Sequence, residues 1–271
     1  MLAKVYEPRY YRPTFLCQPK LNGIRCLYQN GNLVSREGEV WSHECLRHIR
    51  LAIQQLEPGN NILDGELYCH GMSLQQINSR VAVMRVEPHK DEYAIQYHIF
   101  DYVSRLPTVE RMLRLTEMFK SVSDIYGVSL VPTFVTRSEA DADRHHLQFK
   151  SLGYEGTMYR CPTSPYAIVG EHPRKDNRVS WLLKRKDWLD LDAVIVQVLP
   201  GEDSFSSTMG SFELDFNGLR FKAGSGPTHS ERAEYWKLRH KMPGLRVKVQ
   251  YEMLSDSGTP LKPVIIQVEL P

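Results

Sequence analysis

A lysine beside a predicted turn is the first group in this chain whose setting could serve chemistry. Lys20 stands directly before Leu21-Asn22-Gly23-Ile24, and Arg25 follows five positions after the lysine. A lysine amine attacks an electrophile only after losing its proton, so a reactive lysine needs cations, a metal or desolvation around it. Taken alone, the hexamer is more typical of a surface lysine before an Asn-Gly turn.

An ordered series of short motifs follows Lys20 and changes this interpretation. The motifs are Ser35-Arg36-Glu37-Gly38, Asp64-Gly65-Glu66-Leu67, Phe100-Asp101-Tyr102-Val103, Glu155-Gly156-Thr157-Met158-Tyr159-Arg160 and Leu183-Lys184-Arg185-Lys186. In order and spacing the set resembles the motifs of the covalent nucleotidyltransferases, the family of ATP-dependent DNA ligases, RNA ligases and mRNA capping enzymes. The length resembles the minimal ligases of phages and viruses.

The resemblance implies that Lys20 is the catalytic nucleophile, which attacks the α-phosphorus of ATP and holds AMP. Lys184 and Lys186 would then assist as catalytic and ATP-binding residues. Residues two apart in a strand project to one face, so both amines can reach a single phosphate and neutralise its charge. The alternative for this pair is a solvated basic edge strand.

Two glutamates and an aromatic residue complete the expected nucleotide site. By the resemblance Glu66 contacts the ribose, and Glu155 serves the divalent metal together with Glu66. Mg²⁺ needs only one or two protein carboxylates beside phosphate oxygens and water, and Mn²⁺ is an alternative. Phe100 falls where the family stacks a ring on adenine, although a core position is its alternative. Gln18 is expected to read the adenine amino group, and Asp64 to order a turn before Gly65 rather than bind metal.

Basic residues are expected to contact DNA. The resemblance places Arg25 on the nucleotide sugar and the nick end, and Arg36 on the 5′-phosphate, tasks that suit a planar guanidinium. Arg160 is expected in the same constellation, with a structural salt bridge as the competing role. Arg178 is expected to contact phosphate. The same is expected of other surface cations, although each of them alone is more typical of a residue with no contact to DNA: Arg9, Arg12, Arg174, Lys175, Arg220 and Lys222.

Two positions depart from the family pattern. The family carries aspartate where this chain has Asn22, which we expect to lie at the DNA end and to bring no charge to a metal or to the 3′-hydroxyl. The basic motif near the chain end is also unclear, since capping enzymes carry Arg-x-Asp-Lys there and only Lys262 stands in a comparable place. Lys262 could equally cap a strand.

The bulk composition limits the class of protein. The chain has 271 residues, 42% hydrophobic and 24% charged, and no apolar run near the roughly 20 residues of a bilayer crossing. Five cysteines without a CxxC pair indicate reduced thiols and no zinc site, hence a cytoplasmic protein, which we expect to be monomeric. The formal net charge is only +2, so phosphate binding must come from local clusters.

The pattern of elements predicts two domains. Helical spacing marks residues 44–56, 73–85, 108–122 and 138–152, with strand-like stretches at 61–68, 94–103, 156–160 and 181–186, and a hairpin at Asn30-Gly31. After Lys186 the sequence predicts five strands and one helix (residues 230–241), as a small Greek-key barrel of the oligonucleotide-binding (OB) type requires. We therefore expect an α+β fold: a nucleotidyltransferase (ATP-grasp-like ligase) catalytic domain over residues 1–188, then a small β-barrel OB-fold domain over 189–271.

These expectations combine into one function with named alternatives. The sequence predicts an ATP-dependent DNA ligase for replication or repair, which seals 3′-OH/5′-phosphate nicks in duplex DNA through a lysyl-AMP and then an adenylated DNA intermediate. Nineteen residues precede Lys20, too few for the domain by which NAD-dependent ligases capture nicotinamide, so ATP is the expected cofactor. The alternatives are an RNA ligase, a capping-type nucleotidyltransferase, or a non-catalytic nucleic-acid clamp, which Asn22 alone favours.

Overall fold

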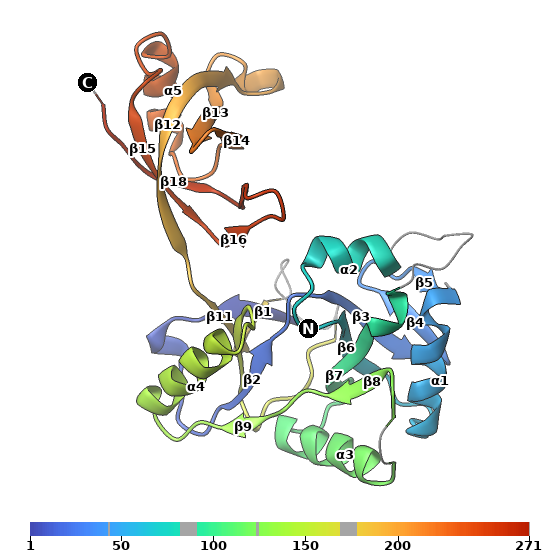
Figure 1. The fold of residues 1–271 in the computed structure, drawn as a ribbon. Coiled ribbons are helices and arrows are strands. Elements are labelled where there is room, and N and C mark those ends of the chain that lie inside the picture. The colour runs from blue at the N-terminus through green and yellow to red at the C-terminus, as the bar shows by residue number, and fades with distance from the viewer. Residues whose placement is uncertain (43, 82–90, 123–124, 169–177, 271) are drawn as a thin grey trace. The chain divides into compact units, whose positions relative to one another are not determined.

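The chain forms two compact units, Met1–Arg185 and Lys186–Pro271 (Figure 1). The computed structural model describes residues 1–42, 44–81, 91–122, 125–168 and 178–270. The boundary between them along the chain falls three residues before the one expected from the sequence.

A six-stranded sheet in the order β5-β4-β3-β6-β7-β8 forms one half of the first unit. Its strands are antiparallel except for the parallel pair at the edge, β7 with β8. Their bounds are β3 Ile24–Gln29, β4 Asn32–Ser35, β5 Val40–Trp41, β6 Leu63–Tyr68, β7 Gln96–Tyr102 and β8 Val128–Leu130.

A five-stranded sheet in the order β1-β11-β10-β2-β9 forms the other half of this unit. Its bounds are β1 Leu2–Val5, β2 Leu16–Lys20, β9 Phe134–Val135, β10 Gly156–Arg160 and β11 Arg178–Lys186. In the antiparallel pair of β10 with β2, Gly156 lies opposite Lys20 and Arg160 lies opposite Leu16. The two ends of the Glu155–Arg160 motif are thereby fixed against the strand that ends in Lys20.

Among the described residues of this unit, four α-helices pack on these sheets, because each turns a row of buried side chains inward. They are α1 Arg47–Gln55, α2 Leu74–Val81, α3 Thr108–Lys120 and α4 Glu139–Ser151. In α1 the buried residues Ile49, Ala52 and Ile53 follow the i, i+3, i+4 spacing of one helix face. Helix α4 lies against β2 and β10 (Figure 1) and begins at the N-cap Ser138, whose hydroxyl accepts from the Asp141 amide. It ends just before Gly153, as the sequence predicted.

The hairpin between β3 and β4 confirms the turn expected from Asn30-Gly31. Gln29 lies opposite Asn32, and both turn residues have positive φ, 50° at Asn30 and 79° at Gly31. These are the angles of a type I′ turn, whose twist matches that of the strands it joins.

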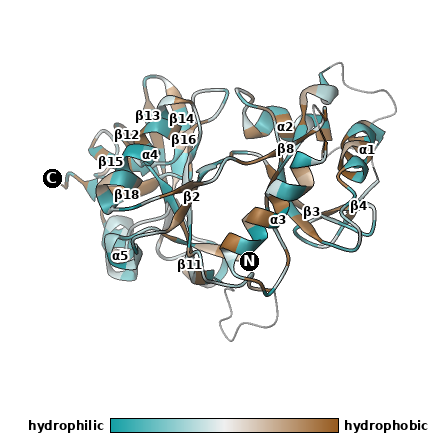
Figure 2. Ribbon diagram, turned by 90° about the horizontal axis from the view of Figure 1, so that it is seen from below, coloured by the Kyte–Doolittle hydropathy of each residue, from teal (hydrophilic) through white to brown (hydrophobic). Residues whose placement is uncertain are grey.

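The second unit is a five-stranded antiparallel sheet in the order β14-β13-β12-β15-β18, with helix α5 (His229–Lys237) on β12 and β13. Its core is separate from that of the first unit, and α5 is hydrophilic along most of its outer length (Figure 2). Of the residues that the structure describes, only the bridge between Ser225 and Val264 connects the two end strands. The bounds are β12 Leu189–Pro200, β13 Met209–Phe216, β14 Leu219–Ala223, β15 Arg246–Tyr251 and β18 Val264–Val268, with a small hairpin of β16 Met253–Leu254 and β17 Pro260–Leu261.

Across the described ranges, no helix joins the length and the apolar character that a bilayer crossing demands. All five cysteines are free, as the sequence predicted.

Candidate active site

Lys20 lies at the end of β2 and forms an ion pair with Glu155. The backbone holds the pair together, because the Glu155 amide donates to the Lys20 carbonyl at 3.0 Å, one step before β10 begins. The Lys20 side chain is 20% exposed and that of Glu155 is 11% exposed. The amine is therefore sheltered but reachable, as a nucleophile must be.

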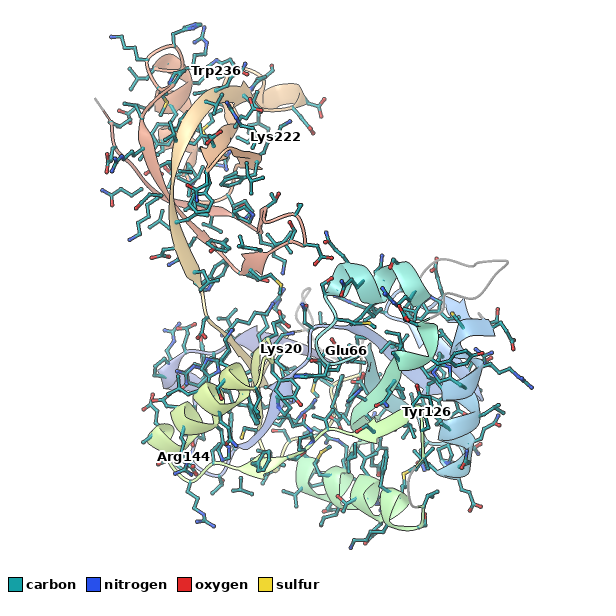
Figure 3. The ribbon with its side chains drawn as sticks, viewed as in Figure 1. Lys20, Glu66, Tyr126, Arg144, Lys222 and Trp236 are labelled. Atoms are coloured by element: carbon teal, nitrogen blue, oxygen red, sulfur yellow. The ribbon has the colours of Figure 1, made fainter. Side chains whose placement is uncertain are left out.

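Glu66 lies on β6 near the same amine (Figure 3). Burial raises its pKa to about 7, against the opposing effects of the Lys20 ammonium and of the Gly23 amide, which donates to Oε1 at 2.6 Å. The negative charge of Glu155 raises this pKa further. The structure thus brings together Lys20, Glu155 and Glu66, which the sequence had assigned to one site.

The donor set fits a magnesium ion. Glu66 and Glu155 supply two carboxylates at one place, and Mg²⁺ needs no more from a protein when phosphate oxygens and water fill the remaining positions. Within the described ranges, no group of three or more His, Cys, Asp or Glu side chains could cage a metal. Two carboxylates suit an ion whose other ligands are phosphate oxygens and water.

Arg25 is held in a fixed orientation on β3. Its guanidinium binds Asp64 in two-point fashion, at 2.9 and 2.7 Å, and also donates to the Met1 carbonyl at 2.7 Å. The Tyr166 hydroxyl donates to the same carboxylate at 2.8 Å. The expectation that Asp64 orders a turn is wrong, because Asp64 lies within strand β6 and its buried charge is paired with Arg25.

Phe100 lies on β7, partly buried beside two guanidinium groups. The Arg160 group is 5.3 Å from its ring centroid and the Arg25 group is 5.9 Å from it. Gln18 is 1% exposed, and its amide already binds the Phe100 carbonyl, Thr133 and Arg160. Adenine reading by Gln18 stays a prediction, and it requires the amide to exchange one of these partners.

Arg160 occupies the structural role that the sequence left open. Its guanidinium is buried and donates to Asp101 and to Gln18, each at 2.7 Å. Asp101 is shared with Arg111, which binds both of its carboxylate oxygens. The structure therefore favours the structural salt bridge over a DNA contact for Arg160, because this guanidinium is buried and bound to Asp101 and Gln18.

The lysines of the last motif lie in different surroundings. Lys184 is partly buried on β11, within the first unit, and its carbonyl accepts from the Tyr6 amide at 2.8 Å. Lys186 belongs to the second unit, where it binds Glu252 at 3.0 Å. Lys262 binds the same carboxylate at 2.7 Å and is 68% exposed. Although burial alone would raise it, the pKa of Glu252 is lowered by hydrogen bonds from these two lysines.

The residues expected at DNA lie mostly at the surface. Arg36 is exposed just after β4, and together with Arg25 it lines a cavity of about 430 Å³ in the first unit. Asn22 is partly buried in the segment between β2 and β3, and Arg178 is exposed at the start of β11. Arg174 and Lys175 lie outside the described residues.

Sequence reasoning missed several residues that bind and orient the site residues. Asp101, Tyr166 and Thr133 received no role, although each binds a predicted site residue. Arg111 received none either, although it binds Asp101. The available signal was the charge of Asp101 and Arg111 among apolar neighbours, since buried charges are almost always paired. The partners themselves come from distant segments, and no local pattern names them.

Comparisons with known proteins agree with this geometry. A family model described as "ATP dependent DNA ligase domain" matches residues 1–186, and one described as "DNA ligase OB-like domain" matches residues 200–268. The DNA ligase of African swine fever virus (isolate Warthog/Namibia/Wart80/1980) is 26% identical over 269 residues, which cover 91% of this chain. The chain spans 61% of the length of that relative.

Solved structures share the fold. A Lig E DNA ligase superposes with a TM-score of 0.80 at 21% identity, covering 99% of this chain and 98% of the other. The Chlorella virus DNA ligase-adenylate gives a TM-score of 0.56 at 22% identity, covering 100% and 97%. Together with the family matches, they confirm the expected fold, a nucleotidyltransferase domain followed by an OB-fold domain.

Proposed function

We propose that this chain, which belongs to the family of ATP-dependent DNA ligases, seals nicks in duplex DNA by way of an AMP carried on Lys20. The observation that supports this most is the grouping of Lys20, Glu155 and Glu66 at the junction of β2, β10 and β6. Residues 1–188 would transfer the adenylyl group, and the OB-fold region from residue 189 would bind DNA.

The first step is adenylylation of Lys20. The deprotonated Nζ attacks the α-phosphorus of ATP, a nitrogen–phosphorus bond forms, the bond from that phosphorus to the bridging oxygen breaks, and pyrophosphate leaves. Glu155 holds Nζ at the end of β2 by their ion pair. A magnesium ion held by Glu155 and Glu66 would supply positive charge to the phosphates.

The later steps pass AMP to DNA and then release it. The 5′-phosphate oxygen at the nick attacks the lysyl-bound phosphorus, the nitrogen–phosphorus bond breaks, and adenylated DNA forms. The 3′-hydroxyl oxygen then attacks the 5′-phosphorus, a phosphodiester forms and AMP leaves. Arg36 and Arg25 are the candidates to hold the 5′-phosphate and the nick end, since both residues line one cavity.

The cofactor and partner follow from this proposal. ATP with Mg²⁺ would be the nucleotide substrate, nicked duplex DNA the polynucleotide substrate, and the active form a monomer. The five free thiols suit a reducing compartment.

A nick-sealing assay tests the proposal. Purified protein is incubated with ATP, magnesium and a duplex carrying one nick, and the joined strand is counted on a denaturing gel. Lys20→Ala should abolish joining, whereas Lys120→Ala, which removes an exposed lysine at the end of α3, should not. Joining that persists in Lys20→Ala would contradict the proposal.

Two further arms address the alternatives. Sealing of nicked RNA but not nicked DNA would identify an RNA ligase. Labelling of the protein by α-labelled GTP but not by α-labelled ATP would identify a capping-type enzyme, and labelling by neither would identify a clamp.

A further inference from the structure

A chain of buried polar contacts connects Phe100 to the strand that ends in Lys20. Arg160, on β10, donates from Nε to the Gln18 amide oxygen and from Nη1 to an Asp101 carboxylate oxygen, each at 2.7 Å. Gln18 is two residues before Lys20 on β2, and Asp101 directly follows Phe100 on β7. Three strands from two sheets therefore meet at one guanidinium.

Gln18 makes the second half of this connection. Its amide nitrogen donates to the Phe100 carbonyl at 3.2 Å and to the Thr133 hydroxyl at 2.9 Å. The amide oxygen is taken by Arg160, so the side chain joins β2 to β7 while it binds β10. A side chain that is 1% exposed and satisfied at both ends has one stable orientation.

The Phe100 ring lies against the same guanidinium. The Arg160 group is 5.3 Å from the ring centroid, within the range of a cation–π interaction. The ring is thus fixed through the Phe100 carbonyl, through neighbouring Asp101 and by Arg160 itself.

We propose that Arg160 and Gln18 are positioning residues that hold the Phe100 ring, as the platform for the adenine base, at a fixed distance from the Lys20 amine. This inference rests on the proposed function. It gives Arg160 a role in nucleotide binding in place of the DNA contact that the sequence suggested. It also gives Gln18 a role that does not require direct contact with the base.

The charges around Asp101 allow this idea to be tested in folded protein. Arg111 binds Asp101 at 2.7 and 3.1 Å and makes further bonds to the carbonyls of Leu106 and Ser164. Removal of the Arg160 charge therefore leaves Asp101 with a counterion. Replacement of Gln18 by methionine removes the amide from the other end of the connection and changes no charge.

The experiment compares two constants, the KM for ATP and the Kd for DNA, in four variants. The KM for ATP is measured in lysine adenylylation, and the Kd for a nicked duplex is measured without ATP or metal. We expect Arg160→Met and Gln18→Met each to raise the KM for ATP about tenfold, with the Kd for DNA unchanged within about twofold. Arg160→Lys keeps the charge but not the two-point geometry and should fall between Arg160→Met and the unaltered chain. Arg144→Met, which removes an exposed arginine of α4 (Figure 3), should change neither constant.

A double substitution separates positioning of the ring from a general loss of structure. If Arg160 acts through Phe100, the effect of Arg160→Met on the KM should largely vanish in a Phe100→Leu background. Additive effects would overturn the inference, and so would a weakened Kd for DNA with an unchanged KM for ATP. An unaltered chain that takes no AMP from ATP would overturn the proposed function and this inference with it. Normal adenylylation with the same KM in Arg160→Met and Gln18→Met would overturn this inference alone.

Discussion

The carboxyl group of Glu66 is partly buried beside Lys20 and Glu155, and this burial raises its pKa to about 7 from an ordinary 4.5. Between these two values the folded chain holds a proton that the unfolded chain has released. Unfolding therefore releases a proton, and the free energy of unfolding falls as the pH rises through this window. The loss at pH 8 amounts to at most about 3 kcal/mol.

Glu66→Gln should remove this pH dependence. Relative to the unaltered chain, the variant should gain up to about 3 kcal/mol in free energy of unfolding between pH 5 and pH 8, because glutamine has no proton to release. Urea unfolding at several pH values, without ATP or metal, measures the difference. Glu39→Gln, at an exposed carboxyl of the same unit, is the control, and parallel curves for Glu66→Gln and the unaltered chain would contradict the prediction.

Asn22 allows a second test at the scale of single residues. We predict that Asn22→Asp leaves adenylylation of Lys20 intact and does not impair nick sealing, because the family carries a carboxylate at this position. Single-turnover assays measure the rate of adenylylation and the rate of nick sealing separately. A large loss of sealing would show that the amide itself is required.

The residues of the site were only partly predictable. Lys20, Glu155 and Glu66 could be named because each belongs to a short motif of neighbouring residues. The burial of Arg160 could not, because it depends on Gln18 and Asp101, which lie 142 and 59 positions away along the chain. A guanidinium that can bind either a phosphate or a carboxylate looks the same in a sequence.

At the scale of elements, strand β6 depends on a residue without a side chain. A Cβ at Gly65 would lie 2.6 Å from the Tyr97 ring and 2.7 Å from the His98 carbonyl. The ring cannot move freely, because the Tyr97 hydroxyl donates to the carbonyls of Cys26 and Leu63, each at 3.0 Å.

Gly65→Ala should therefore destabilise the first unit by about 1–3 kcal/mol through overpacking, and shift Glu66 with the strand. Thermal unfolding measures the first effect, and the rate of lysine adenylylation measures the second. A variant with unchanged stability and rate would show that β6 and β7 can separate at this point without cost.

Elements with local signals were predicted well. The range expected at residues 156–160 is the observed β10, and the Asn30-Gly31 turn joins β3 and β4 as expected. Strand β1 was missed, because its parallel pairing with β11 joins Leu2 to Arg178 and no local pattern records such a partner. The two-residue strands β5 and β9 are too short to carry a periodic pattern.

At the scale of the whole molecule, a formal net charge of +2 means that overall charge would contribute little to the proposed binding of DNA. Binding to a nicked duplex should depend on a limited set of phosphate contacts. We predict that the logarithm of the association constant falls linearly with the logarithm of the salt concentration, with a slope of about −0.9 for each contact. Arg36→Gln should make this slope shallower by about one contact, and an identical slope would exclude Arg36 from phosphate binding.

The central claim is that the amine of Lys20 carries the adenylyl group. Mass spectrometry of the intact chain after exposure to ATP and magnesium, followed by peptide mapping, tests it most directly. We expect a gain of one AMP located on Lys20, lost on addition of pyrophosphate and absent from Lys20→Ala. An unmodified chain, or AMP on any other side chain, would contradict it.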